Sequence, residues 1–151
     1  MFHGVLQQPE IPPNTGNLMR LCVTTGNRLH LIRPLGFDLD DARLRRAGLD
    51  YREYADVEEH DDLDAFFNAV RPPRVFAFSQ HAERLYTSVA YANGDALLFG
   101  SESVGLPTEA LDHPAVEDRL RIPIAPGGRS LNLANAAAII VYEAWRQADF
   151  A

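Results

Sequence analysis

The sequence predicts an α/β protein with one domain, in which a mostly parallel sheet is flanked by helices. Two observations predict this fold class. Short apolar runs alternate with longer segments of helical periodicity, as expected for strands that are joined by crossover helices. The chain has 151 residues and is 46% hydrophobic, which suffices for one compact core within a single domain spanning residues 1–151.

The individual elements can be placed from these runs. The expected strands are residues 2–6, 29–32, 51–54, 75–78, 96–99 and 120–122, and the expected helices cover about 15–25, 40–47, 61–70, 107–112 and 131–147. Asn14 or Thr15 is expected to cap the first helix, and Ser130 the last. The last helix has apolar residues at every third or fourth position, which predicts one buried stripe: Leu131, Ala134, Ala138, Val141, Ala144 and Trp145.

The charge balance bears on possible partners. The formal net charge is −7, and all 14 basic residues are arginine. This balance weakly disfavours a nucleic-acid partner, because phosphates attract basic surfaces. The acidic residues are concentrated between positions 56 and 64, however, and we interpret that run as a mostly solvated patch. An arginine-lined face elsewhere on the molecule therefore remains open.

The single cysteine and the lack of long apolar runs indicate a cytoplasmic protein. Cys22 excludes an intrachain disulfide and suits a reducing compartment, and its apolar helical context favours a buried structural thiol. No apolar run approaches the roughly 18–20 residues of a membrane-spanning helix, so we expect no membrane association. The first six residues lack a basic region and are expected to form a strand, not a signal peptide.

The first of three unusual segments is 9–20. Three prolines stiffen the exit of the first strand, and Asn17 and Arg20 lie one helical turn apart. Two interpretations stay open on spacing alone. Arg20 is either a simple exposed residue of a capped helix, or an arginine held beside the carboxyl edge of the sheet, where ligands of open α/β sheets bind.

The second segment, 97–107, is a strand that enters a loop between two glycines. The spacing of Gly100 and Gly105 is that of a phosphate loop, but Leu106 and Pro107 replace the Lys-Ser/Thr that such a loop requires. A G-x-G-x-x-G fingerprint is also absent from the sequence. What remains is a loop with exposed backbone groups, the carboxylate of Glu102 and glycines that permit close approach to a ligand.

The third segment, 121–135, runs from a strand through a Pro/Gly-rich loop into an alanine-rich helix. Ser130, Asn132 and Asn135 are polar residues in the first turns of that helix. Capping explains Ser130, but asparagine is unfavourable inside helices and costly to bury without hydrogen bonds. We therefore expect a polar ligand or partner at this helix start, and hence a functional site.

Other kinds of site find less support. The five histidines are scattered without metal-binding spacing, so no metal is expected, and His60 within the acidic run is interpreted as a surface residue. Ser79 and Ser101 follow strands but lack a G-x-S-x-G elbow, which disfavours a hydrolase triad.

Taken in order, the three segments resemble the motifs of the knotted SPOUT methyltransferases. The ribose 2′-O-methylating branch of that family carries Asn-x5-Arg, Gly-x-Glu-x-x-Gly-[Leu/Ile] and Ser-[Leu/Met]-Asn signatures. Here they read Asn14 to Arg20, Gly100 to Leu106, and Ser130-Leu131-Asn132. The chain resembles most the short, single-domain TrmL-like tRNA (cytidine/uridine-34)-2′-O-methyltransferases, also over 9–17, 40–51 and 141–147.

The resemblance implies a function and a fold. It implies methyl transfer from S-adenosylmethionine to the ribose 2′-hydroxyl of a tRNA nucleotide, at the wobble position 34. It also implies a sheet whose C-terminal part forms a trefoil knot, and a homodimer with Tyr142 and Trp145 of the last helix at its interface. Cofactor contacts are implied at Phe78, Gly100, Ile122 and Ser130.

The same resemblance assigns catalytic roles to residues of the three motifs. Arg20 assists deprotonation of the hydroxyl, either as a base or by electrostatic stabilisation, and Ser130 and Asn132 orient the ribose and the methionine end of the cofactor. Glu102 positions loop elements, and Asn14 belongs to the same catalytic set. The candidates for RNA contacts are Asn17, Arg43, Arg45 and Arg46, together with Arg71 and Arg74.

Two alternatives remain beside this interpretation. One is a 2′-O-methyltransferase that acts on another RNA target. The other is a non-catalytic α/β module that binds RNA or a nucleotide.

Overall fold

The computed structural model describes residues 1–40, 42–45 and 56–151. It contains one sheet of seven strands, in the order β3-β2-β1-β6-β4-β7-β5, and every pairing in it is parallel. The strands are β1 His3–Gln7, β2 Arg28–Ile32, β3 Val57–His60, β4 Val75–Phe78, β5 Arg84–Leu85, β6 Ala96–Phe99 and β7 Val116–Arg121. The helices are α1 Pro12–Thr25, α2 Ala42–Arg45, α4 Leu63–Val70, α5 Thr108–Leu111 and α6 Leu133–Gln147, with a 3₁₀ turn at Tyr86–Ser88.

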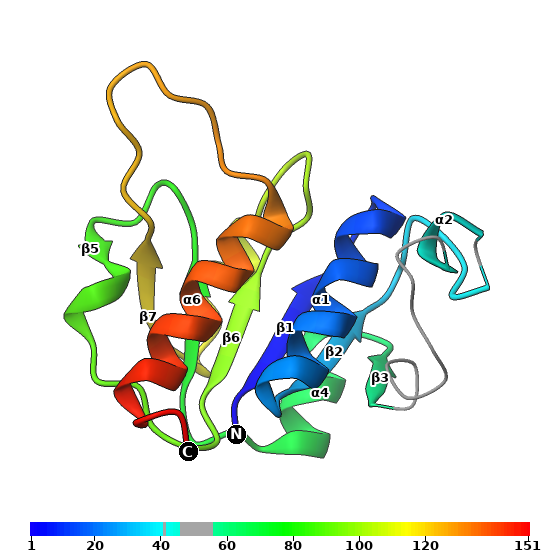
Figure 1. Cartoon of the computed structure of the whole chain (residues 1–151), viewed down its shortest axis with the longest axis horizontal. Coiled ribbons are helices and arrows are strands. Elements are labelled where there is room, and N and C mark those ends of the chain that lie inside the picture. The colour runs from blue at the N-terminus through cyan, green and yellow to red at the C-terminus, as the bar shows by residue number, and fades with distance from the viewer. Residues whose placement is uncertain (41, 46–55) are drawn as a thin grey trace.

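Helices cover both faces of this sheet (Figure 1). Side chains alternate between the faces, so Phe76 packs in the cluster beneath α1 and α6, whereas Val75 and Ala77 pack in the cluster beneath α4 and α5. β6 has a continuous apolar sequence because it is buried on both faces of the sheet. The predicted α/β class with a parallel sheet is therefore confirmed.

Most predicted elements are present, with four differences. The expected strand at 51–54 lies outside the described residues. β3 lies instead in the acidic run, at a sheet edge where polar side chains can face solvent, so that run is not only a solvated patch. The two-residue strand β5 was not predicted, and β7 begins four residues earlier than expected because its polar residues alternate along a partly exposed strand.

The predicted N-terminal caps of α1 and α6 were both wrong. α1 begins after Ile11, whose side chain makes no capping bond, and Pro12 and Pro13 occupy its first turn. α6 begins after Asn132, whose Oδ1 accepts hydrogen bonds from the backbone N–H groups of Ala134 and Asn135. The buried face of α6 also differs in part from the predicted stripe: Ala137, Ile140, Val141 and Ala144.

The predictions for Cys22 and for membrane helices can also be compared with the structure. Cys22 is 2% exposed in the core, and burial raises the pKa of its thiol to about 12, as befits a structural thiol. Among the described residues, none of the helices combines the length and the apolar character needed to cross a membrane.

Three histidines form a row across neighbouring strands. Nδ1 of His3 on β1 lies 3.0 Å from Nε2 of His30 on β2, and Nδ1 of His30 lies 3.0 Å from Nε2 of His60 on β3. Burial lowers the pKa of all three imidazoles, and that of His30 to about 3. The interpretation of these histidines as scattered was therefore wrong, as was that of His60 as a surface residue, because its exposed fraction is 8%.

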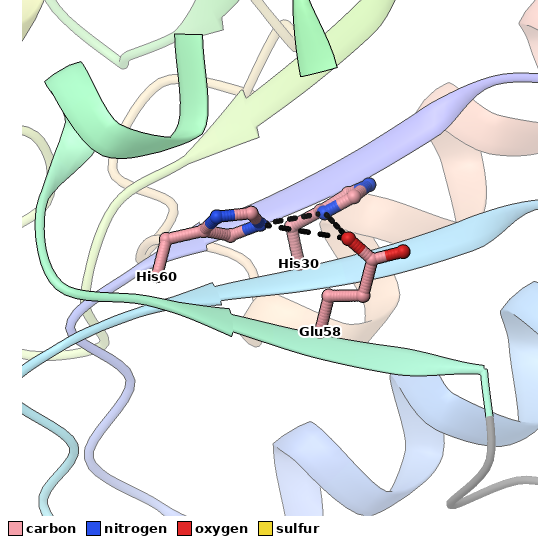
Figure 2. Close-up of side chains that lie close together, drawn as sticks. All are labelled: His30, Glu58 and His60. Carbon is pink, nitrogen blue, oxygen red and sulfur yellow. Dashed lines mark hydrogen bonds and ion pairs between the residues drawn. The ribbon is translucent and has the colours of Figure 1, made fainter. Parts of the chain in front are cut away.

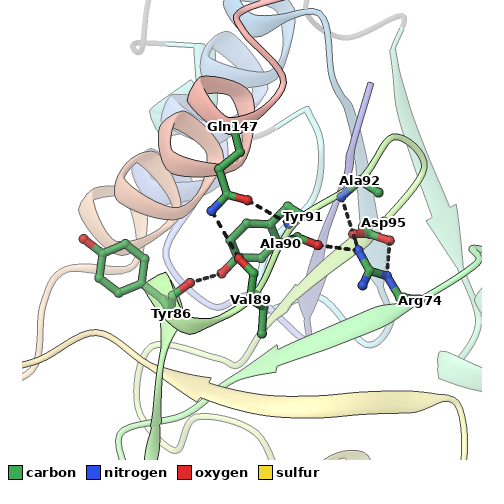
Figure 3. A network of polar contacts seen from close by, with 8 residues as sticks. All are labelled: Arg74, Tyr86, Val89, Ala90, Tyr91, Ala92, Asp95 and Gln147. Atoms are coloured by element: carbon green, nitrogen blue, oxygen red, sulfur yellow. Dashed lines mark hydrogen bonds and ion pairs between the residues drawn. The ribbon is translucent and has the colours of Figure 1, made fainter.

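A buried ion pair anchors the segment that leads into β6 (Figure 3). The Asp95 carboxylate is fully buried. It accepts hydrogen bonds from Nε and Nη2 of Arg74 at 3.0 and 2.6 Å, and from the backbone N–H of Ala92 at 2.8 Å. Gln147 of α6 joins the same segment, accepting from the N–H of Tyr91 and donating to the carbonyl of Val89. Arg74 therefore has a structural role, and its contact with RNA stays a prediction.

Replacing Arg74 by methionine should destabilise the fold by about 3 kcal/mol, because the buried Asp95 carboxylate loses its counter-charge. Urea denaturation of the purified variant measures this loss. The matched control is Arg119→Met, which removes an ion pair whose two side chains are about half exposed and should cost about 0–1 kcal/mol. Equal losses in the two variants would contradict the role assigned to Arg74.

Candidate functional site

One cavity of about 620 Å³ opens at the carboxyl edge of the sheet. Parallel strands end at the same edge, so the loops after β1, β4, β6 and β7 meet there (Figure 1). The chain winds outward from β1 to β3 and then crosses to β4 on the other side of β6, so β1 and β6 flank a topological switch point. Open α/β sheets bind ligands at such a point.

The cavity brings together seven of the predicted site residues from all three segments. These are Asn14, Phe78, Gly100, Glu102, Ile122, Ser130 and Asn132. The first comes from α1 and the others from the loops or strand ends at 78–81, 99–106 and 122–133, which shows that the separated motifs share one site.

Glu102 joins the loop after β6 to the start of α1. Its Oε1 accepts a hydrogen bond from the backbone N–H of Glu10 at 2.9 Å, and its Oε2 accepts from the N–H of Ile11 at 2.6 Å. Because α1 has no capping side chain of its own, this carboxylate supplies the negative charge that the positive end of the helix dipole favours. Bonds between a carboxylate and N–H groups are also stronger than neutral ones.

Asn14 and Asn132 extend this link to the third segment. The Nδ2 of Asn14 donates to Oε2 of Glu102 at 3.3 Å, and its Oδ1 accepts from Nδ2 of Asn132 at 3.0 Å. A carboxylate can only accept, so the orientation of the first amide sets that of the second. Oδ1 of Asn132 is thereby left to cap α6.

This hydrogen-bond chain corrects the reason for which the third segment was singled out. Asn132 is exposed and acts as a helix cap, and Asn135 is exposed on the first turn of α6, so neither is a buried amide in need of a ligand. Ser130, the expected cap, instead lines the cavity two residues before the actual N-cap, Asn132.

Glu10 braces the tip of the loop after β6 and was not predicted. Its Oε1 accepts from the hydroxyl of Ser103 at 2.6 Å and from the backbone N–H of Ser103 at 3.1 Å. These two hydrogen bonds hold the pKa of the exposed Glu10 carboxyl below its usual value. The loops after β1 and β6 thus hold each other through two carboxylates, one from each loop.

The glycines of the second segment allow the backbone to close on itself. A Cβ on Gly100 would lie 2.1 Å from the carbonyl carbon of Gly105 and 2.2 Å from the amide nitrogen of Leu106. Gly105 has a φ of +68° and donates its N–H to the carbonyl of Ser101, which completes the closed turn. The expected close approach is therefore an approach of backbone to backbone.

The cavity also has an apolar side. The rings of Phe78 and Phe99 are stacked with centroids 5.0 Å apart, and Leu106 and Ile122 line the same space. Phe99 and the cavity residues 79–81 were missed as site residues. Phe99 is the last residue of β6, and residues 79–81 follow β4 directly, so both lie at the carboxyl edge. The strand order was the missing information, because only neighbouring strands bring their following loops together.

The other predicted site residues lie elsewhere. Asn17 and Arg20 are exposed on α1, and neither belongs to the cavity lining. Arg43 is exposed on α2, whereas the side chain of Arg45 and the whole of Arg46 lie outside the described residues. Tyr142 is 43% exposed on α6 and packs edge to face against Trp145, with ring centroids 5.7 Å apart.

Gly100→Ala should open the closed turn, because backbone atoms occupy the place of the added methyl group. We expect a destabilisation of about 1–3 kcal/mol and at least roughly tenfold weaker binding of S-adenosylmethionine, measured by calorimetric titration. Gly105→Ala is the matched control, since a Cβ there meets open space and only the left-handed backbone is strained, at about 1–2 kcal/mol. Similar affinities in both variants would show that the close approach at Gly100 does not shape the site.

Comparison with known proteins identifies the family of this chain. The family model described as "SpoU rRNA Methylase family" matches residues 1–142. The tRNA (cytidine(34)-2′-O)-methyltransferase of Aeromonas hydrophila is 57% identical over 151 residues, which cover 100% of this chain and 97% of that protein. A solved structure described as "Structural insights into the 2-OH methylation of C/U34 on tRNA" is 48% identical, with a TM-score of 0.90 over 99% of this chain and 97% of the other.

A more distant solved structure contains the expected cofactor. The AdoMet-bound rRNA methyltransferase of Sinorhizobium meliloti is 26% identical, with a TM-score of 0.84 over 96% of this chain and 56% of the other. With a family model over most of its length and a relative that matches it from end to end, the chain belongs to the SpoU family of RNA methylases.

Proposed function

We propose that this protein transfers a methyl group from S-adenosylmethionine to the ribose 2′-hydroxyl of nucleotide 34 in tRNA, a cytidine or a uridine. The observation that carries the proposal is the hydrogen-bond chain from Glu102 through Asn14 to Asn132 along one cavity. The activity of the 57% identical relative supports the same reaction and the same nucleotide.

The cavity suits S-adenosylmethionine in size and in lining. Its volume of about 620 Å³ falls within the range of small-molecule sites, roughly 300–1,000 Å³. Apolar groups such as Phe78 and Ile122 fit the adenosyl part, and the loop backbone at Gly100 lies open to its polar edge. Ser130 and Asn132 lie at the α6 end of the cavity and would hold the methionine end or the ribose.

The chemistry requires positioning and removal of a proton. S-adenosylmethionine, when bound, supplies an electrophilic methyl group on a sulfonium. The ribose hydroxyl is a poor nucleophile, and it loses its proton to solvent water as the new O–C bond forms and the C–S bond breaks, which leaves S-adenosylhomocysteine. The hydrogen-bonded loops of this chain contribute mainly by fixing the geometry of the two reactants, since a preorganised site lowers the entropic barrier.

Arg20 is proposed as the residue that stabilises the forming alkoxide. The pKa of an arginine normally exceeds 12, which favours an electrostatic role over that of a base. Arg20 is exposed on α1 and does not belong to the lining of its own chain's cavity. We therefore propose that it serves the cavity of a second protomer, with the RNA bound between the two.

A homodimer fits the exposed apolar side chains near the end of α6. Ile139 and Tyr142 are 37% and 43% exposed, and Phe150, which packs against Trp145, is 55% exposed. Since α1 and α6 lie side by side on one face of the sheet, a partner that covers α6 would also come close to α1, the helix that carries Asn17 and Arg20 (Figure 1). Arg43, Arg45 and Arg46 remain candidates for RNA contacts, and the trefoil knot remains a prediction.

Incubation with methyl-labelled S-adenosylmethionine and bulk tRNA should transfer label to a single 2′-O-methylated nucleotide at position 34. Nuclease digestion followed by mass spectrometry identifies that nucleotide. Label at another tRNA position, or in ribosomal RNA only, would mean that the chain is a methylase of another target. Binding of S-adenosylmethionine without any transfer would favour a non-catalytic module.

Arg20→Ala should lower the rate by about 100-fold or more, the range typical of a lost group that stabilises a forming oxyanion. The binding of S-adenosylmethionine should be unchanged, because Arg20 lies outside the cavity lining. If the site is shared between protomers, the Arg20→Ala and Gly100→Ala proteins can complement each other. Mixing them under conditions that exchange subunits, at a cofactor concentration too low to fill the Gly100→Ala cavity, should raise the activity above that of either protein alone. Lack of recovery, with exchange demonstrated, would place Arg20 at its own chain's cavity, and full activity of Arg20→Ala would remove it from catalysis.

A further inference from the structure

The row of histidines continues into a carboxylate that has no role in the methylation site. Glu58 lies on β3 two residues before His60, and the sheet register places it opposite His30. Because residues two apart in a strand face the same way, His30, Glu58 and His60 lie together on the face of the sheet that α4 covers (Figure 2). None of the three belongs to the lining of the cavity described above.

The distances among these three side chains are those of a set of metal ligands. Nδ1 of His30 and Nε2 of His60 are 3.0 Å apart, and Oε2 of Glu58 lies 3.8 Å from the first and 4.0 Å from the second. Both separations from the carboxylate are too long for a hydrogen bond. The point equidistant from the three atoms lies about 2.1 Å from each, which is the bond length that Zn²⁺ makes with imidazole nitrogen and carboxylate oxygen.

The surrounding residues orient the three ligands. Nε2 of His30, on the far side of the ring, lies 3.0 Å from Nδ1 of His3, and a metal-bound histidine characteristically donates its second N–H in this way. Oε1 of Glu58 accepts from Arg28 at 3.4 Å, which leaves Oε2 toward the histidines. His30 is 1% and His60 8% exposed, whereas Glu58 is 47% exposed, so an ion and a bound water can enter from the edge of the sheet.

We propose that His30, His60 and Glu58 form a binding site for one Zn²⁺ ion, with water as the fourth ligand. Two imidazoles and one carboxylate are a donor set that zinc accepts in tetrahedral geometry. The three donor atoms reach that geometry when the nitrogen pair opens slightly and the Glu58 carboxylate moves a few tenths of an ångström closer to both histidines. The ion would join the edge strand β3 to β2 by bonds stronger than those of the strand ladder alone. The site lies apart from the cavity, so its role is structural and independent of the proposed methylation.

The test is a titration of the full chain with ZnCl₂ after a chelator has removed any metal. A chromophoric indicator competes for the zinc, and its absorbance reports the affinity of the protein. We expect saturable binding of one ion per chain and a rise in the unfolding temperature with zinc concentration, because an ion that binds only the folded state stabilises it. Co²⁺ in place of zinc should give the intense visible absorption of a four-coordinate site.

Variants distinguish zinc binding at this site from nonspecific binding of zinc at the surface. Glu58→Gln keeps the size of an exposed side chain, so the fold should persist while zinc affinity falls by at least about 100-fold and the thermal shift disappears. His3→Ala, which removes only the partner of a ligand, should weaken binding by about 10–100-fold. The control His113→Gln removes a histidine that is paired with Asp64 elsewhere and should bind zinc like the unaltered protein.

Two results would overturn the proposal. One is the absence of one-to-one zinc binding by the metal-free chain. The other is binding that survives in both Glu58→Gln and His60→Gln, since the ion would then be held by other groups.

Discussion

The Glu102 carboxylate is the contact on which the site depends. It accepts two backbone N–H groups at the start of α1, and through Asn14 it also fixes the amide of Asn132 at the start of α6. Three loops that are far apart in the sequence are thereby held by one anion. A carboxylate serves here better than a neutral group because the positive end of α1 and the N–H donors all favour negative charge.

The sheet order explains why these loops can meet at all. β1 and β6 are neighbours although their paired residues, such as His3 and Ala96, are 93 positions apart along the chain, and β4 and β7 lie beyond β6. All strands are parallel, so their following loops leave from one edge and surround the cavity. The Arg74–Asp95 pair contributes at the opposite end of β6, where it holds the entry into that strand (Figure 3). The same parallel register aligns His3, His30 and His60 across three strands.

The methylation site and the histidine row show two uses of polar groups in one sheet. At the carboxyl edge, polar groups face an open cavity and bond mainly to backbone groups of neighbouring loops. In the interior, His30 and His60 pack against Phe66 with tilted and edge-to-face rings, and they lie within hydrogen-bonding distance of each other. Burial keeps these imidazoles neutral by lowering their pKa, so a row of three can exist without mutual repulsion. Neutral imidazole is also the form that binds metals.

The fold class, most of the elements and the second and third segments of the site could be predicted from the pattern of residues, whereas segment 9–20 was assigned only through its resemblance to a family. The apolar run of β6 and the periodicity of α6 are local signals in the sequence. The Gly-x-Glu-x-x-Gly loop can also be recognised from the sequence, because its glycines serve a local turn. Only the tertiary structure decided which groups meet. Asn132 and not Ser130 caps α6 because Asn14 orients its amide, Arg20 lies away from the cavity of its own chain, and β3 forms at an edge where polar residues suffice. The physical reason is that each of these outcomes depends on a contact between residues remote in sequence, which the alternation of strands and helices does not encode.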